Sequence, residues 1–221
     1  MLSGTLASVI ASSQPPGQRL PMIVAGVAFQ GLGFMIAFLM YAIYVHRLME
    51  FGLPSPDLRP ALFISVGPPS FTGLALIGIS LALPENYGYF ASHTEAIAIL
   101  QVLALFIAIF LWMLAFWFCC VTICAVLVSV RTMSFHLAWW SFVFPNVGFA
   151  IATTKIGQQL GSPGISGVAS AMTILLVALW IFLFICTIRA VMNKQILMPG
   201  KDEDKDDHKV DDGDHGRGAP R

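Results

Sequence analysis

The chain has 221 residues, of which 57% are apolar and only 11% charged, and its mean hydropathy is +0.79. Soluble domains carry about 25% charged residues, so this composition excludes an ordinary water-soluble domain. The zero net charge is a cancellation, because residues 198–221 hold eight of the twelve acidic and five of the twelve basic residues. No basic run favours nucleic acid as a partner. The composition therefore predicts a membrane protein whose surroundings are the lipid bilayer.

Five apolar stretches are long enough to cross the hydrocarbon core as helices, which takes about 20 residues each. They are residues 20–48, 60–84, 95–130, 135–160 and 166–197. The third lacks Pro, Gly and Asn, so it offers no turn at which to fold back, and we expect one long helix. Since only helices and closed barrels satisfy their backbone groups in lipid, the pattern predicts an all-α, polytopic helical bundle.

The two ends of the chain differ in character. Residues 1–12 are apolar but too short to span, which indicates the end of a further helix or, as an alternative, the core of a signal peptide. We expect residues 1–197 to form the transmembrane domain. Residues 198–221 are dense in charge, which predicts a disordered acidic tail. His208 and His215 in that tail lie among aspartates, and a solvated segment explains them better than a metal site does.

The basic residues predict an orientation. If every span crosses once, one side of the membrane receives Arg47, Arg59, Arg131, Arg189 and Lys194, and the other receives Arg19, Glu85, Glu95 and Lys155. Lys and Arg are enriched in cytoplasmic loops, so the C-terminus should be cytoplasmic. We expect an integral membrane protein of the plasma membrane.

Two of the spans carry prolines in their interiors, whereas the others are smooth. One carries Gly67, Pro68, Pro69, Ser70 and Thr72, and the other carries Phe144, Pro145 and Asn146. A proline inside a helix frees a carbonyl, which in lipid must be satisfied by protein or by water in a cavity. Broken helices of this kind often line substrate sites, so we expect these residues to line a pathway. The alternative is that the prolines are only packing kinks.

No catalytic constellation is visible in the spans. They contain no carboxylate pair, no Ser/His/Asp set and no HExxH, so we expect neither catalytic residues, nor a bound metal, nor a cofactor. A pathway lined by hydroxyls, an amide and freed backbone groups suits the passage of a small anion. Arg59 and Lys155 lie near opposite mouths and could attract anions, or could serve as interface anchors. Cys119, Cys120, Cys124 and Cys186 fall in apolar runs and act as small hydrophobes.

The two proline motifs resemble those of a known transporter family. The segment 59–72, which contains VGPPSFT, resembles the tellurite-resistance/dicarboxylate transporter family, and VGPPSFTGLAL resembles its fungal malate-permease branch. The segment 135–145, FHLAWWSFVFP, is similar to the AWW…FP motif of that family, and residues 1–8 are a weaker third match. Together the resemblance covers about residues 1–197.

The resemblance implies a ten-helix ring of five helical hairpins around a central pore, with kinked inner and smooth outer helices. The chain corresponds to the C-terminal half, starting inside the fifth helix, so a fragment is one expectation and a homo-oligomer that completes the ring is another. Motif alignment places a pore gate at Phe144, with a packing aromatic as the alternative.

The implied function is transport of C4-dicarboxylate anions, malate first. The alternative within the family is an anion channel or a sulfite exporter. The alternative of another class is a truncated, non-transporting membrane protein.

Overall fold

The computed structural model describes residues 2–193, and every regular element among those residues is helical. The prediction of an all-α fold is therefore confirmed for this part of the chain. The predicted tail, residues 198–221, lies outside the described residues, as do residues 194–197 at the end of the last predicted span. The α-helices are α1 (Ser3–Ala11), α2 (Pro16–Phe51), α3 (Gly67–Leu81), α4 (Thr94–Leu127), α5 (Phe144–Gln159) and α6 (Pro163–Met192). Three 3₁₀ segments join them: η1 (Pro56–Val66), η2 (Gly88–Ala91) and η3 (Leu137–Phe142).

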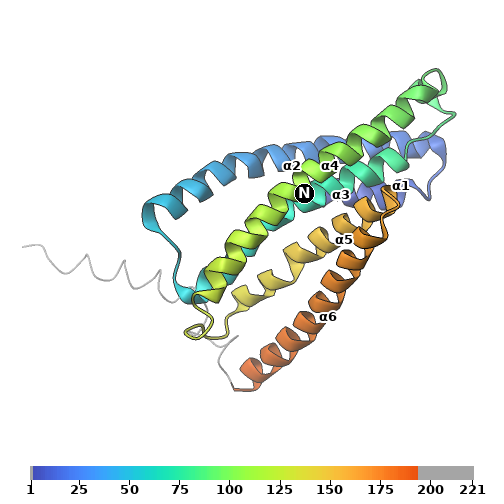
Figure 1. Ribbon diagram of the computed structural model, residues 1–221. Coiled ribbons are helices and arrows are strands. Elements are labelled where there is room, and N and C mark those ends of the chain that lie inside the picture. The colour runs from blue at the N-terminus through green and yellow to red at the C-terminus, as the bar shows by residue number, and fades with distance from the viewer. Residues whose placement is uncertain (1, 194–221) are drawn as a thin grey trace, which may run out of the picture. The chain divides into compact units, whose positions relative to one another are not determined.

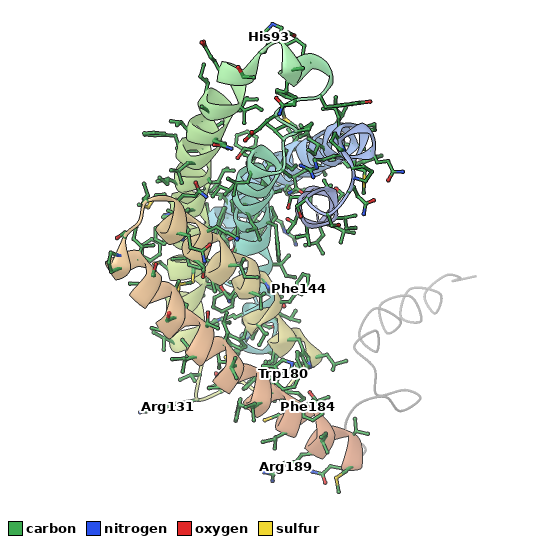
Figure 2. All side chains as sticks on the ribbon, turned by 90° about the vertical axis from the view of Figure 1, so that its right-hand side faces the viewer. His93, Arg131, Phe144, Trp180, Phe184 and Arg189 are labelled. Carbon is green, nitrogen blue, oxygen red and sulfur yellow. The ribbon has the colours of Figure 1, made fainter. Side chains whose placement is uncertain are left out.

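The chain divides into two compact units, and the boundary between them falls at residues 179 and 180 of α6. The first unit ends at Leu179 and contains α1 to α5 with the start of α6. The second begins at Trp180, and its described part is the remainder of α6. In that part Trp180 and Phe184 stack one turn apart, with ring centroids separated by 5.5 Å (Figure 2).

Four helical segments of the described chain are long and apolar enough to cross a membrane: Pro16–Phe51, Pro56–Leu81, Thr94–Leu127 and Pro163–Met192. They overlap four of the five predicted spans. The remaining predicted span, residues 135–160, differs, because its first part forms η3 and the α-helix begins only at Phe144. Helix α5 alone has 16 residues, whereas η3 and α5 together run from Leu137 to Gln159.

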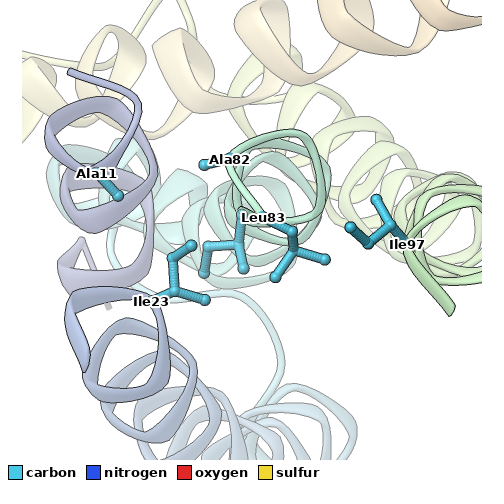
Figure 3. Packing of buried hydrophobic residues seen from close by; sticks show 6 residues of the cluster. Ala11, Ile23, Ala82, Leu83 and Ile97 are labelled. Atoms are coloured by element: carbon cyan, nitrogen blue, oxygen red, sulfur yellow. The ribbon is translucent and has the colours of Figure 1, made fainter. Parts of the chain in front are cut away.

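Helix α3 lies among the other helices of the first unit, in contact with α1, α2, α4 and α5 (Figure 1). Within the most apolar window of each span, 78% of the residues are buried in the span that contains α3, against 22% in α2 and 22% in α4. One apolar cluster joins four helices near the end of α3, where Ile79, Ala82 and Leu83 meet Ala11, Ile23 and Ile97 (Figure 3). The first unit is therefore organised around α3.

Glycines on α3 allow this close packing. A Cβ on Gly73 would lie 3.3 Å from the Cα of Ala108 in α4, and one on Gly78 would lie 2.5 Å from the Oγ of Ser8 in α1. Small residues of this kind let membrane helices approach until their backbones are in van der Waals contact. Close backbone packing at these glycines, together with burial of apolar side chains, thus fixes the position of α3.

Candidate functional site

The central helix begins at a break. The 3₁₀ segment η1 ends at Val66, and α3 starts at Gly67, with Pro68 and Pro69 in its first turn. The Ser65 carbonyl would accept a hydrogen bond from residue 69 in an α-helix and from residue 68 in a 3₁₀-helix. Because both residues are prolines, both donors are missing. The carbonyl is instead satisfied from another helix, by the Tyr41 hydroxyl at 2.8 Å.

A second break lies at the start of α5. Segment η3 ends at Phe142, and α5 begins at Phe144 with Pro145 in its first turn. Asn146 donates through Nδ2 to the Phe142 carbonyl at 2.9 Å, which satisfies an acceptor at the break. A Cβ on Gly67 would lie 3.7 Å from the Cβ of Pro145. The two breaks are therefore in contact, and the structure brings the two proline motifs together.

Phe144 lies at this junction and is largely exposed within the chain. Its side chain, labelled in Figure 2, is 61% exposed. Its ring centroid is 5.9 Å from that of Phe71 in α3. Gly148, one turn on, leaves room for Phe71, since a Cβ there would lie 2.8 Å from the ring. Phe142 by contrast packs inward on Phe63, with centroids 5.3 Å apart. The two phenylalanines of this motif thus have different surroundings.

The hydroxyls predicted to line a pathway are already hydrogen-bonded inside the protein. Ser70 is 1% exposed and donates to the Val66 carbonyl at 2.7 Å. Thr72 is 6% exposed and accepts from Gln30 Nε2 of α2 at 2.9 Å. Pro69 is fully buried, and Pro68 is half-buried. Of the predicted lining residues, Phe144 is therefore the one with a largely exposed side chain.

The two predicted anion-attracting residues lie apart from the junction. Arg59 donates through Nε to the Pro54 carbonyl and through Nη1 to the Ala125 carbonyl, both at 3.1 Å. Ala125 is in the last turn of α4, where a cation is favoured by the helix dipole. This contact supports the anchoring alternative for Arg59. Lys155 is half-buried, three turns along α5 from Phe144.

Three polar residues that contact the broken helices were not expected from the sequence, because they lie in apolar spans without proline breaks. They are Gln30 and Tyr41 in α2, and Trp112 in α4, whose Nε1 donates to Thr153 Oγ1 of α5 at 2.7 Å. Each links a smooth helix to a broken one. The available signal was their polarity, since polar groups within a span usually have a specific partner.

The fold and its apolar helices define a class: a helical integral membrane protein. Among the described residues, no group of three or more His, Cys, Asp and Glu side chains could hold a metal ion. The family model described as SLAC1, voltage-dependent anion channel, matches residues 1–188. The chain belongs to this family of anion channels and transporters, and the resemblance seen in its motifs is confirmed.

Three curated relatives give further detail. The chain is 36% identical to a malic acid transport protein and 35% identical to a putative malic acid transport protein, both of Schizosaccharomyces pombe, over 92% and 93% of its length. It is 22% identical to a sulfite efflux pump of Arthroderma benhamiae over 89% of its length. These alignments cover 47%, 48% and 52% of the relatives, so the chain spans about half of their length. No solved structure matches significantly.

Proposed function

We propose that the protein to which this chain belongs transports C4-dicarboxylate anions, malate first, across a membrane and is not an enzyme. The observation that carries the proposal is the 36% identity to a malic acid transport protein over nearly the whole chain. It is supported by the match of residues 1–188 to the anion-channel family model.

The broken helices are the proposed pathway. The starts of α3 and α5 are in contact, and the positive end of a helix dipole favours negative charge. In the ten-helix ring that the family resemblance implies, the exposed side of Phe144 faces the pore and acts as its gate. The half-buried Pro68 is the second residue we assign to this lining, whereas Ser70 and Thr72 support it from behind.

A second function is favoured by one observation, the similarity to a sulfite efflux pump. Its 22% identity is well below that of the malate relatives, so sulfite or another small inorganic anion ranks second. Uptake of labelled malate into a strain that lacks its own malate carriers, with sulfite as comparator, separates the two substrates. Malate uptake above the empty-vector control supports the proposal, and sulfite flux without malate uptake contradicts it.

The proposed orientation places the α2–η1 loop and the C-terminus in the cytoplasm of a plasma-membrane protein. The structure supports a shared side for two of the basic loops, since Asp57 Oδ1 accepts hydrogen bonds from the Ser134 N–H at 2.7 Å and from the Ser134 hydroxyl at 2.9 Å. A cysteine introduced at Gly213 should stay unlabelled by an impermeant maleimide in intact cells. Labelling before permeabilisation would reverse the proposed orientation.

A further inference from the structure

One face of the smooth helix α2 reaches both sides of the break in the neighbouring span. Gln30 and Tyr41 are 11 residues apart, which is close to three full turns, so both side chains leave α2 on the same side. Ala37 lies on this face as well and is 8% exposed. The remainder of α2 carries large exposed apolar residues, as expected of a surface that faces lipid.

The contact before the break is made by Tyr41. Its hydroxyl donates to the Ser65 carbonyl, two residues ahead of Gly67, where α3 begins. Pro68 and Pro69 remove both local donors for this carbonyl, as described above. The aromatic ring is held in place by Phe118 of α4, with centroids 4.6 Å apart. An acceptor that the prolines leave unpaired is thus satisfied from a different helix.

The contact after the break is made by Gln30. This residue is 2% exposed, and its Nε2 donates to Thr72 Oγ1 in the second turn of α3 at 2.9 Å. Its Oε1 accepts from the backbone N–H of Gly4 in α1 at 3.3 Å. Both functional atoms of the buried amide are therefore used, and three helices are joined at one point.

We propose that α2 acts as a splint, in which Tyr41 and Gln30 are positioning residues that hold η1 and α3 in a fixed relative position on either side of Pro68 and Pro69. Six residues, 66–71, lie between the two attachment points, Ser65 and Thr72, and both prolines are among them. This position determines where the start of α3 lies relative to α5. The consequence for anion selectivity rests on the proposed transport function, whereas the mechanical claim does not.

The mechanical claim predicts coupling between Tyr41 and Pro69. In purified protein, Tyr41→Phe should lower the midpoint of thermal unfolding by about 2–4 °C, because the Ser65 carbonyl is left unpaired. Pro69→Ala restores a backbone N–H that can reach this carbonyl. In the Pro69→Ala background, Tyr41→Phe should therefore have little effect. Tyr89→Phe, at a 64% exposed position outside the spans, is the control for loss of a hydroxyl.

The positioning role predicts a change in selectivity without loss of folded protein. Gln30→Met keeps the size of the side chain and removes both hydrogen bonds, and it should change the ratio of malate to sulfite uptake by about threefold per surface-expressed molecule. Gln101→Met is the matched control, because Gln101 is also a glutamine within an apolar helix but makes only a long contact of 3.5 Å to the Ser80 carbonyl. It should leave the ratio unchanged.

The outcomes separate the splint from the transport function. An equal loss of unfolding midpoint from Tyr41→Phe in both backgrounds, or no loss in either, overturns the splint. An unchanged uptake ratio in folded Gln30→Met overturns the positioning role. If the unaltered protein takes up neither anion, the proposed transport fails, and the unfolding measurements still decide the mechanical claim.

Discussion

Helices α3 and α4 pack against each other but differ in opposite directions in hydropathy and in burial. The span that contains α3 has a hydropathy of 1.7 and is 78% buried in its most apolar window, whereas α4 has a hydropathy of 2.8 and is 22% buried. In a water-soluble protein the more apolar helix would be the buried one. Here the less apolar span is inside, because lipid accepts apolar side chains as readily as the protein interior does. High hydropathy therefore marks the outer helices of this fold.

The same comparison shows what holds the inner helix in place. Helix α4 is unbroken from Thr94 to Leu127 and has no glycine. Helix α3 begins at a break and has glycines at contact points and buried hydroxyls that are all hydrogen-bonded. Shape and hydrogen bonds drive helix association in lipid, so a residue's effect on stability should depend on its contacts and not on its hydropathy.

The largest expected loss comes from separating α1 from α3. Gly78→Val should destabilise the fold by about 1–3 kcal/mol, because a Cβ at this position would lie 2.5 Å from the Ser8 Oγ and 2.8 Å from its Cβ. Gly31→Val on α2 is the control, since nothing lies within 4 Å of a Cβ there. Thermal unfolding in detergent measures both. Equal losses in the two variants would show that close packing at Gly78 has no special weight.

The next effect concerns transport and not stability. Pro68→Ala combined with Pro69→Ala should lower malate uptake by about tenfold, or about 1.4 kcal/mol, at equal surface abundance. The reason is that alanines restore two backbone N–H groups, so that α-helical hydrogen bonds can form across the junction of η1 and α3. Uptake is normalised to surface-labelled protein. Unchanged uptake would return these prolines to a packing role.

The smallest effect concerns the polar link between α4 and α5. Trp112→Phe keeps an aromatic ring and removes the hydrogen bond from Nε1 to Thr153. The free energy of unfolding should fall by about 0.6 kcal/mol, the average for such bonds in membranes. Trp117→Phe is the matched change on the same helix, at a side chain that is 49% exposed, and should cost less. An equal or larger loss at Trp117 would contradict the view that this bond holds α5 to α4.

The sequence predicts where the helix breaks lie but not which residues of other helices contact them. The starts of α3 at Gly67 and of α5 at Phe144 coincide with proline motifs, because the lack of a backbone N–H is a local property. The hydrogen-bond partners of the Ser70 and Thr72 hydroxyls could not be predicted from the sequence. Thr72 meets Gln30 across 42 residues of sequence, and nothing in the local pattern pairs them.

The sequence also did not predict that the fourth span, residues 135–160, contains a 3₁₀ segment before its α-helix. Hydropathy extends the apolar stretch back to residue 135, but the chain there forms the short 3₁₀ segment η3. In this region the Trp139 ring packs against the rings of Phe135 and Phe142. Apolar composition alone does not distinguish such a segment from the first turns of an α-helix. The α-helix starts only where Phe144 and Pro145 set its first turn.

The central claim is that the junction of the two broken helices is an anion pathway with Phe144 as its gate. Its most direct test is anion flux per surface-expressed molecule of Phe144→Ala, with Phe142→Ala as the control. Phe144 is 61% exposed, so its truncation removes little packing within the chain, whereas Phe142 packs on Phe63. The account predicts a rise in flux for Phe144→Ala, because widening an apolar constriction admits hydrated anions, and no rise for Phe142→Ala. A fall in flux that follows protein abundance in Phe144→Ala would contradict it.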